Sequence, residues 1–201
     1  KLLKNVDSSK IEFDEKSSSI KLGKNMKIDL GGIAKGYTSS RVMQIFKDCG
    51  VTSGLVSLGG NVQALGTKTD GTDWQIAIEN PDKSSDYIGV VSVKDKAVIT
   101  SGGYERYFEN NGKTYHHILD PKTGYPAESG LKSVTIVSDN GTLADALSTS
   151  LFVMGKEKAL DYWREYKNEF DTVLVEDNGN ITITDGLKKV FKSNFKFDIA
   201  K

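Results

Sequence analysis

The chain has 201 residues, of which 27 are Lys or Arg and 27 are Asp or Glu, so its formal charge at pH 7 is zero. This balance excludes a bulk positive field that would attract nucleic acid, and any bound anion must therefore be held by a local site. The length suits one substantial core. The single cysteine excludes an internal disulfide or a multi-cysteine metal site. No stretch approaches the roughly 20 apolar residues that span a bilayer.

The first quarter of the chain predicts a β-hairpin followed by a helix. Apolar and polar residues alternate in 10–14 and 20–22, on either side of a polar turn, which is typical of a hairpin. Residues 26–32 predict the end of a strand and a tight glycine turn, and 33–50 predict an amphipathic helix that ends at a glycine. We expect Cys49 to be a small buried side chain near the end of this helix.

The middle of the chain predicts a mainly antiparallel sheet. Strand-like runs occur at 54–58, 61–65, 74–79, 87–93, 97–100 and 132–138. An Asn-Gly turn at 110–112 favours a hairpin between residues 104–109 and 113–119. This hairpin carries His116 and His117.

The C-terminal part adds helices to this sheet. Residues 142–154 and 157–166 have helical apolar spacing, and a last hairpin pairs 172–176 with 180–184. We find no repeat, low-complexity segment or linker. The sequence therefore predicts a single α+β domain over residues 1–201, with helices packed on a mainly antiparallel sheet.

A glycine-rich turn before the first predicted helix is a candidate anion-binding site. Residues 29–36 place two glycines and Lys35 at a helix start, where unpaired amides and the helix dipole favour a phosphate. The spacing is neither that of a Walker P-loop nor G-x-G-x-x-G, so it supports neither an ATPase nor a Rossmann enzyme. A tight strand-to-helix turn with a surface lysine also explains these residues.

Asp145 has two interpretations. Thr142-x-x-Asp145 resembles a helix capping box with Asp in place of Glu, which would make Asp145 purely structural. However, Asp145 and Thr149 are four residues apart and share one helical face, with Ser148 beside them. Their hard oxygen atoms are ligands of the type that Mg²⁺ accepts. The spacing alone leaves both interpretations open.

His116 and His117 are adjacent on a predicted strand, so their side chains should point to opposite faces and only one should enter a given cleft. The other histidine would be exposed or structural. A histidine near neutral pH can remove a proton from an attacking hydroxyl. Zinc binding is the weaker interpretation, because the sequence offers no third soft ligand.

Taken together, five segments closely resemble, in order, the motifs of the ApbE family. They are Asp29-Leu30-Gly31-Gly32-Ile33-Ala34-Lys35-Gly36-Tyr37, Ser57-Leu58-Gly59-Gly60-Asn61, Thr100-Ser101-Gly102, His117-Ile118-Leu119-Asp120-Pro121-Lys122-Thr123-Gly124-Tyr125-Pro126 and Ala144-Asp145-Ala146-Leu147-Ser148-Thr149. The resemblance implies a T-fold-like α+β domain that binds FAD and Mg²⁺, transfers FMN to a threonine hydroxyl as a phosphoester, and releases AMP. It also implies that the family's N-terminal region, which supplies part of the flavin pocket, is missing from this chain.

The resemblance also implies roles for individual residues. Contacts with FAD are implied for Asp29, Lys35, Thr100, Ser101, Gly102 and Leu119. The implied metal ligands are the carbonyl of Gly32 and the side chains of Asp145 and Thr149, with Ser148 assisting. His117 matches the histidine that serves as the general base for the acceptor hydroxyl.

Two other functions remain open. An Mg²⁺-dependent FAD pyrophosphatase would use the same site to direct water at the phosphorus, and a flavin-binding or storage protein would need no catalysis.

The resemblance implies an acceptor protein with a Ser/Thr-Gly-Ala-Thr-like motif, such as a membrane redox protein. It further implies a lipoprotein associated with the extracytoplasmic face of a bacterial membrane, although this chain shows no anchor sequence.

Overall fold

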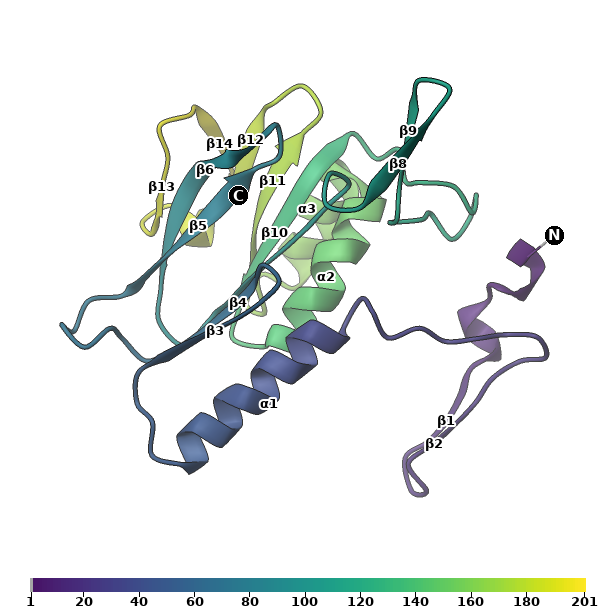
Figure 1. Cartoon of the computed structure of the whole chain (residues 1–201), viewed down its shortest axis with the longest axis horizontal. Helices are drawn as coiled ribbons and strands as arrows, with labels where there is room; N and C mark the ends of the chain where they lie inside the picture. The colour runs from purple at the N-terminus through teal and green to yellow at the C-terminus, as the bar shows by residue number, and fades with distance from the viewer. Residues whose placement is uncertain (1) are drawn as a thin grey trace.

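The computed structural model describes residues 2–201, and Figure 1 shows how its elements are arranged. The helices are α1 (Ala34–Asp48), α2 (Gly141–Met154) and α3 (Lys156–Glu165), with 3-10 turns η1 (Leu2–Asn5), η2 (Ser8–Lys10) and η3 (Asp185–Leu187). The strands are β1 (Glu12–Asp14), β2 (Ser19–Lys21), β3 (Gly54–Leu58), β4 (Asn61–Leu65), β5 (Trp74–Asn80), β6 (Lys83–Val93), β7 (Ala97–Gly102), β8 (Tyr107–Asn110), β9 (Lys113–His116), β10 (Leu131–Ser138), β11 (Asp171–Glu176), β12 (Ile181–Thr184), β13 (Phe191–Lys192) and β14 (Phe197–Ala200). Within the described residues, no helix combines the length and the apolar composition that crossing a bilayer requires.

The main body has three layers. A seven-stranded sheet in the order β14-β12-β11-β10-β7-β4-β3 lies in the middle, and its neighbours are antiparallel except for β12 and β14. Helices α2 and α3 cover one face, and the small sheet β13-β6-β5 covers the other (Figure 1). Helix α1 packs on β3, β4 and α2. This arrangement confirms the predicted α+β class.

The central strands are buried on both faces because each face has its own cover. In β10, Val134 and Ile136 pack toward α2 and α3, whereas Val137 packs toward the small sheet. All three side chains are less than 5% exposed. Strands buried on both faces are nearly continuous apolar runs, and burial of this apolar area is the main favourable contribution to folding. The buried central sheet therefore fixes the positions of the end of β7 and of α2, which packs on it.

The predicted hairpins β1–β2, β8–β9 and β11–β12 are confirmed as antiparallel pairs, and the strand-like runs 54–58 and 61–65 also pair antiparallel, as β3 and β4. In the β8–β9 turn, Asn111 has φ 49° and Gly112 has φ 74°. Two consecutive left-handed residues are the backbone of a type I′ turn, which Asn-Gly favours because these residues tolerate positive φ. The turn chemistry in the sequence thus determined this hairpin.

Two local predictions need correction, and two short strands were not predicted. Residues 26–30 form no strand, because the Asp29 carboxylate accepts a hydrogen bond from the Gly31 amide and bends the chain. Cys49 is exposed, since α1 buries only the face that carries Gly36, Ser39 and Met43. Strands β13 and β14 were not predicted, because two and four residues carry too little pattern.

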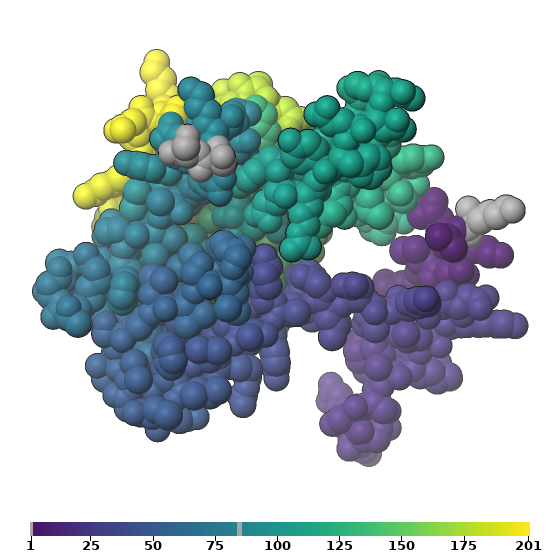
Figure 2. Space-filling model, in the orientation of Figure 1, coloured from purple at the N-terminus to yellow at the C-terminus, as the bar shows by residue number. Residues whose placement is uncertain are grey.

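The N-terminal segment, η1 to β2, lies to one side of the main body (Figures 1 and 2). Its Leu2 and Phe13 side chains are 81% and 75% exposed. Leu3 lies close to Gly124, where an added Cβ would be 3.1 Å from Leu3 Cδ2. Within the described part of the chain, neither buried cluster includes a residue of this segment, so the core of the main body forms without it.

Candidate active site

A cavity of about 540 Å³ opens where the end of β7, the start of α1 and the face of α2 meet. The predicted site residues that line it are Asp29, Gly32, Lys35, Thr100, Ser101, Gly102, His117, Leu119, Asp145 and Thr149. Ser148 is the only predicted site residue outside its wall. Glu105 and Arg106 also line the cavity, and they belong to none of the sequence motifs that predicted the site. In the sequence they lie in residues 104–109, the first strand predicted for the hairpin that carries the two histidines.

The glycine turn forms one wall of the cavity. Asp29 Oδ1 accepts a 2.7 Å hydrogen bond from the Gly31 amide, and the Leu30 carbonyl accepts from the amides of Ile33 and Ala34. Helix α1 starts at Ala34 without a side-chain cap. Ala34 and Lys35 of its first turn line the cavity, and the Gly36 amide of the same turn donates to a carboxylate, that of Asp145. This geometry fits the anion-binding interpretation of the turn.

Asp145 does not cap its helix, so the capping interpretation is wrong. The N-cap of α2 is Asn140, whose side chain accepts from the Leu143 amide. Asp145 lies in the second turn and is only 4% exposed. Its Oδ2 accepts from the Gly36 amide at 2.8 Å, and its Oδ1 accepts from Asn61 Nδ2 at 2.9 Å. These two donors hold the buried carboxylate against the cavity wall.

Helices α1 and α2 approach each other closely at Gly36. A Cβ at Gly36 would collide with the Gly141 carbonyl oxygen and would lie 2.6 Å from Asp145 Cβ. The absence of a side chain therefore lets the Gly36 amide reach the carboxylate. Gly32 differs, because a Cβ there would meet nothing within 4 Å.

We predict that Gly36→Ala lowers the free energy of unfolding by about 1–3 kcal/mol, the usual cost of overpacking. Helix propensity alone would favour Ala by roughly 1 kcal/mol, so the sign of the change tests the close contact. Gly32→Ala is the matched control, and we expect a change within about 0.5 kcal/mol. Urea unfolding measures both variants. A Gly36→Ala protein as stable as its parent would contradict the observed helix packing.

Hydroxyl groups form the floor between β7 and α2. Ser101 Oγ lies 2.8 Å from Ser148 Oγ and 3.0 Å from Thr149 Oγ1. The Thr100 hydroxyl is not part of this group, because its Oγ1 lies 2.8 Å from Thr135 Oγ1 on the neighbouring strand β10. Ser148 is completely buried behind this floor, so it does not reach the cavity directly.

The two adjacent histidines lie on opposite sides of the hairpin base, which confirms the prediction. His117 lines the site cavity, and its Nδ1 lies 3.3 Å from the Arg106 carbonyl oxygen. A carbonyl oxygen only accepts hydrogen bonds, so in the neutral imidazole a hydrogen bond here requires the proton on Nδ1, which leaves the Nε2 lone pair available. His116 contacts the Ala127 carbonyl oxygen through Nε2 at 3.2 Å and packs edge-on against Phe152.

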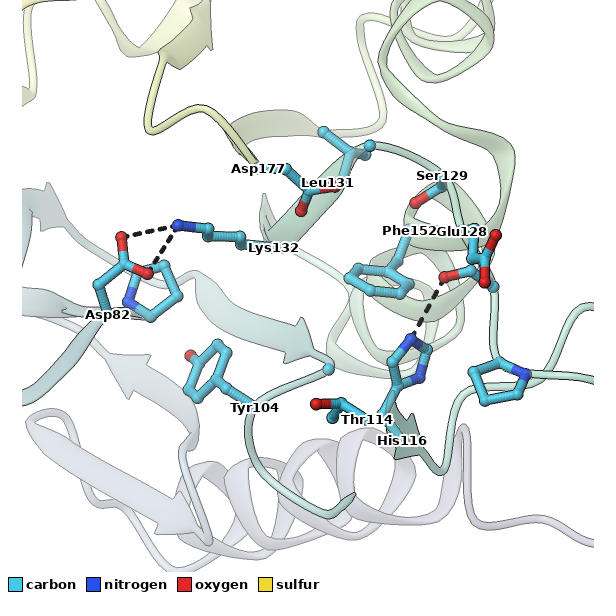
Figure 3. Close-up of a pocket in the computed structure, with 15 residues that line it drawn as sticks. Asp82, Tyr104, Thr114, His116, Glu128, Ser129, Leu131, Lys132, Phe152 and Asp177 are labelled. Carbon is cyan, nitrogen blue, oxygen red and sulfur yellow. Dashed lines mark hydrogen bonds and ion pairs between the residues drawn. The ribbon is translucent and has the colours of Figure 1, made fainter. Parts of the chain in front are cut away.

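His116 lines a second cavity, of about 510 Å³, which contains no predicted site residue (Figure 3). Phe152 lies on one wall, Tyr104 faces it, and Lys132 makes an ion pair with Asp82 at 2.6 Å. Burial and nearby carboxylates raise the pKa of Tyr104, so its phenol stays protonated at neutral pH. The residues predicted from the sequence motifs therefore line the first cavity, and none of them lines the second.

The donor set of the site cavity suits a hard cation. Among the described residues, no group of three or more His, Cys, Asp or Glu side chains could hold a metal. Asp145, Thr149 and Gly32 nevertheless all line the cavity, and each carries oxygen atoms in its side chain or backbone. Mg²⁺ commonly binds through one or two carboxylates and takes its other ligands from substrate phosphates and water. The residues present therefore fit Mg²⁺ bound together with a phosphate compound.

A family model described as the ApbE family matches residues 1–174 of the chain. A FAD:protein FMN transferase of Klebsiella pneumoniae (strain 342) is 38% identical over 174 residues, which are 86% of this chain and 53% of that protein. A FAD:protein FMN transferase of Treponema pallidum (strain Nichols) is 43% identical over 150 residues, which are 70% of this chain and 41% of that protein. The chain thus spans about half the length of the curated relatives it matches.

The crystal structure of the ApbE protein of Thermotoga maritima is similar with a TM-score of 0.87 and 39% sequence identity. The match covers 96% of this chain and 62% of that one. The similarity therefore includes not only the sequence motifs but also the spatial arrangement of nearly all the described helices and strands. On sequence and on structure, the chain belongs to the ApbE family.

Proposed function

We propose that this protein transfers FMN from FAD to a threonine hydroxyl of an acceptor protein and releases AMP. The observation that carries the proposal is one cavity that brings together Lys35 at a helix start, Asp145 and Thr149 on α2, and His117. Splitting a pyrophosphate and activating a hydroxyl require cationic, metal-binding and basic groups in this proximity. The names of the curated relatives support FAD as the donor of FMN.

The pyrophosphate of FAD would lie between Lys35 and Arg106. Both cations line the cavity, and among residues 2–201 neither has an ion-pair partner. They are therefore available to neutralise the charge of the two phosphates. Mg²⁺ held by Asp145, Thr149 and the Gly32 carbonyl would supply further charge neutralisation at the same phosphates. Asp29, Thr100, Ser101, Gly102 and Leu119 would contact the rest of the nucleotide.

His117 would act on the acceptor. Its free Nε2 takes the proton of the threonine hydroxyl while the threonine oxygen forms a bond to the phosphorus of the FMN half. The bond from that phosphorus to the bridging oxygen breaks, and AMP leaves with this oxygen. His117 is exposed, so a side chain from another protein can reach it.

We predict that Lys35→Ala weakens FAD binding and that the loss shrinks at high salt, because salt screens a charge pair that is open to solvent. Riboflavin binding should change little, since riboflavin has no phosphate. Fluorescence titrations with FAD and with riboflavin at low and high salt measure both effects. An equal loss for the two compounds would show that Lys35 does not contact the phosphates.

The partner and the location of the protein follow from the family resemblance. We propose an acceptor that carries a Ser/Thr-Gly-Ala-Thr-like sequence and belongs to a membrane redox system. We also propose that the protein works at the extracytoplasmic face of a bacterial membrane, with a lipid anchor in its full-length form. Mass spectrometry of acceptors expressed with and without the enzyme tests the partner, and cell fractionation tests the location.

Incubation of the purified protein with FAD, Mg²⁺ and a candidate acceptor tests the activity. An acceptor whose mass increases by that of the FMN group supports the transferase. Free FMN and AMP with an unmodified acceptor would favour the pyrophosphatase, in which water takes the place of the threonine. Unchanged FAD that remains bound would favour a flavin-binding protein.

A further inference from the structure

Three hydroxyl groups beside the cavity form a hydrogen-bonded chain that links α2 to the end of β7. Ser148 Oγ donates to the Asp145 carbonyl oxygen at 2.9 Å, and Ser101 Oγ contacts both Ser148 Oγ and Thr149 Oγ1. Ser148 is completely buried, whereas Ser101 and Thr149 line the cavity. The chain therefore runs from the interior of the protein to the cavity wall.

The direction of each hydrogen bond follows from counting protons. A serine or threonine hydroxyl has one hydrogen to donate, and a carbonyl oxygen has none. Ser148 donates its hydrogen to the Asp145 carbonyl, so Ser101 must donate in its contact with Ser148. Ser101 has then used its own hydrogen, and Thr149 must donate in its contact with Ser101.

We infer that Ser148 and Ser101 orient the Thr149 hydroxyl, and that Ser148 is a positioning residue rather than a metal ligand. The inference rests on the proposed function, in which Thr149 Oγ1 is a ligand of Mg²⁺. A hydroxyl ligand must turn a lone pair, and not its hydrogen, toward the cation. With its hydrogen held by Ser101, Thr149 keeps its lone pairs for the cavity. Partners of this kind orient metal ligands and tune their affinity.

The test measures metal binding without turnover of an acceptor. Mg²⁺ is titrated into the protein with saturating FAD, and the Mg²⁺ concentration that gives half of the rise in Tm is recorded. We expect Ser148→Ala to raise this midpoint about tenfold, the lower end of the range typical for outer partners of metal ligands. Ser101→Ala should act in the same direction.

Ser150→Ala is the matched control. Ser150 lies on the same helix and donates to the Ala146 carbonyl oxygen at 2.8 Å, but it is exposed and does not line the cavity. This variant removes a similar bond between a serine and the helix backbone. Its Mg²⁺ midpoint should equal that of the parent. The Tm of each variant without metal reports any purely structural effect separately.

A double variant shows whether Ser148 acts through Thr149. Thr149→Val removes the proposed ligand, so adding Ser148→Ala to it should raise the midpoint no further. A further tenfold rise in the double variant would overturn the inference, because Ser148 would then act independently. Equal midpoints for Ser148→Ala and the parent would also overturn it and would leave the proposed function standing. A parent protein that Mg²⁺ with FAD does not stabilise would refute both.

Discussion

Asp145→Asn is expected to reduce Mg²⁺-dependent transfer by more than about 100-fold, because removing a direct ligand should cost more than the 10- to 100-fold typical of outer partners. The negative charge that attracts Mg²⁺ is lost, while the size of the side chain is kept. The stabilisation that Mg²⁺ with FAD gives the parent should also largely disappear, because a ligand stabilises only the state that it binds. Activity assays and Mg²⁺ titrations of Tm measure the two effects.

The same substitution should leave the metal-free protein nearly as stable as its parent. The new amide oxygen can accept from the Gly36 amide, and the new NH₂ can donate to Asn61 Oδ1, which has no partner among the described residues. Rotation of the Asn61 amide by 180° allows this exchange. We therefore expect a loss of less than about 1 kcal/mol.

Asp145→Ala is the informative contrast. It leaves the Gly36 amide and Asn61 Nδ2 without the acceptors that they contact in the folded protein. Each buried donor left unpaired costs about 1–3 kcal/mol, so this variant should unfold more readily than Asp145→Asn. If Asp145→Asn keeps Mg²⁺-dependent activity, the proposed metal site is wrong and Asp145 only joins α1, β4 and α2.

His117→Ala is expected to lower the rate of transfer to threonine by roughly 10²- to 10⁴-fold, the contribution typical of a general base. FAD binding should be largely retained, because the imidazole acts on the acceptor and not on the nucleotide. The mass of the acceptor measures transfer, and flavin fluorescence measures binding. A large loss of FAD affinity in this variant would show that His117 binds the nucleotide.

His116→Ala is the control for this prediction. It removes the contact with the Ala127 carbonyl oxygen and the edge-on packing against Phe152, so we expect a lower Tm. Below that Tm, transfer should remain close to that of the parent, since His116 lines the other cavity (Figure 3). An essential His116 with a dispensable His117 would reverse the assignment of the two faces.

Much of the local structure was predictable from the sequence, because turn chemistry and apolar spacing act within a few residues. The Asn-Gly turn determines the β8–β9 hairpin, and strand alternation separates His116 from His117. The residues that line the cavity were predicted from separate sequence motifs through the resemblance to the ApbE family. No local pattern would have brought those motifs together.

The tertiary structure decided what each polar group of the site does. Asp145 is bound by residues 109 and 84 positions away in the chain, which removes the capping interpretation that its neighbours suggest. Ser148 is buried and Arg106 reaches the cavity because of how α2, β7 and the hairpin pack. Contacts between such distant segments depend on the close-packed interior as a whole, and a window of neighbouring residues does not contain that information.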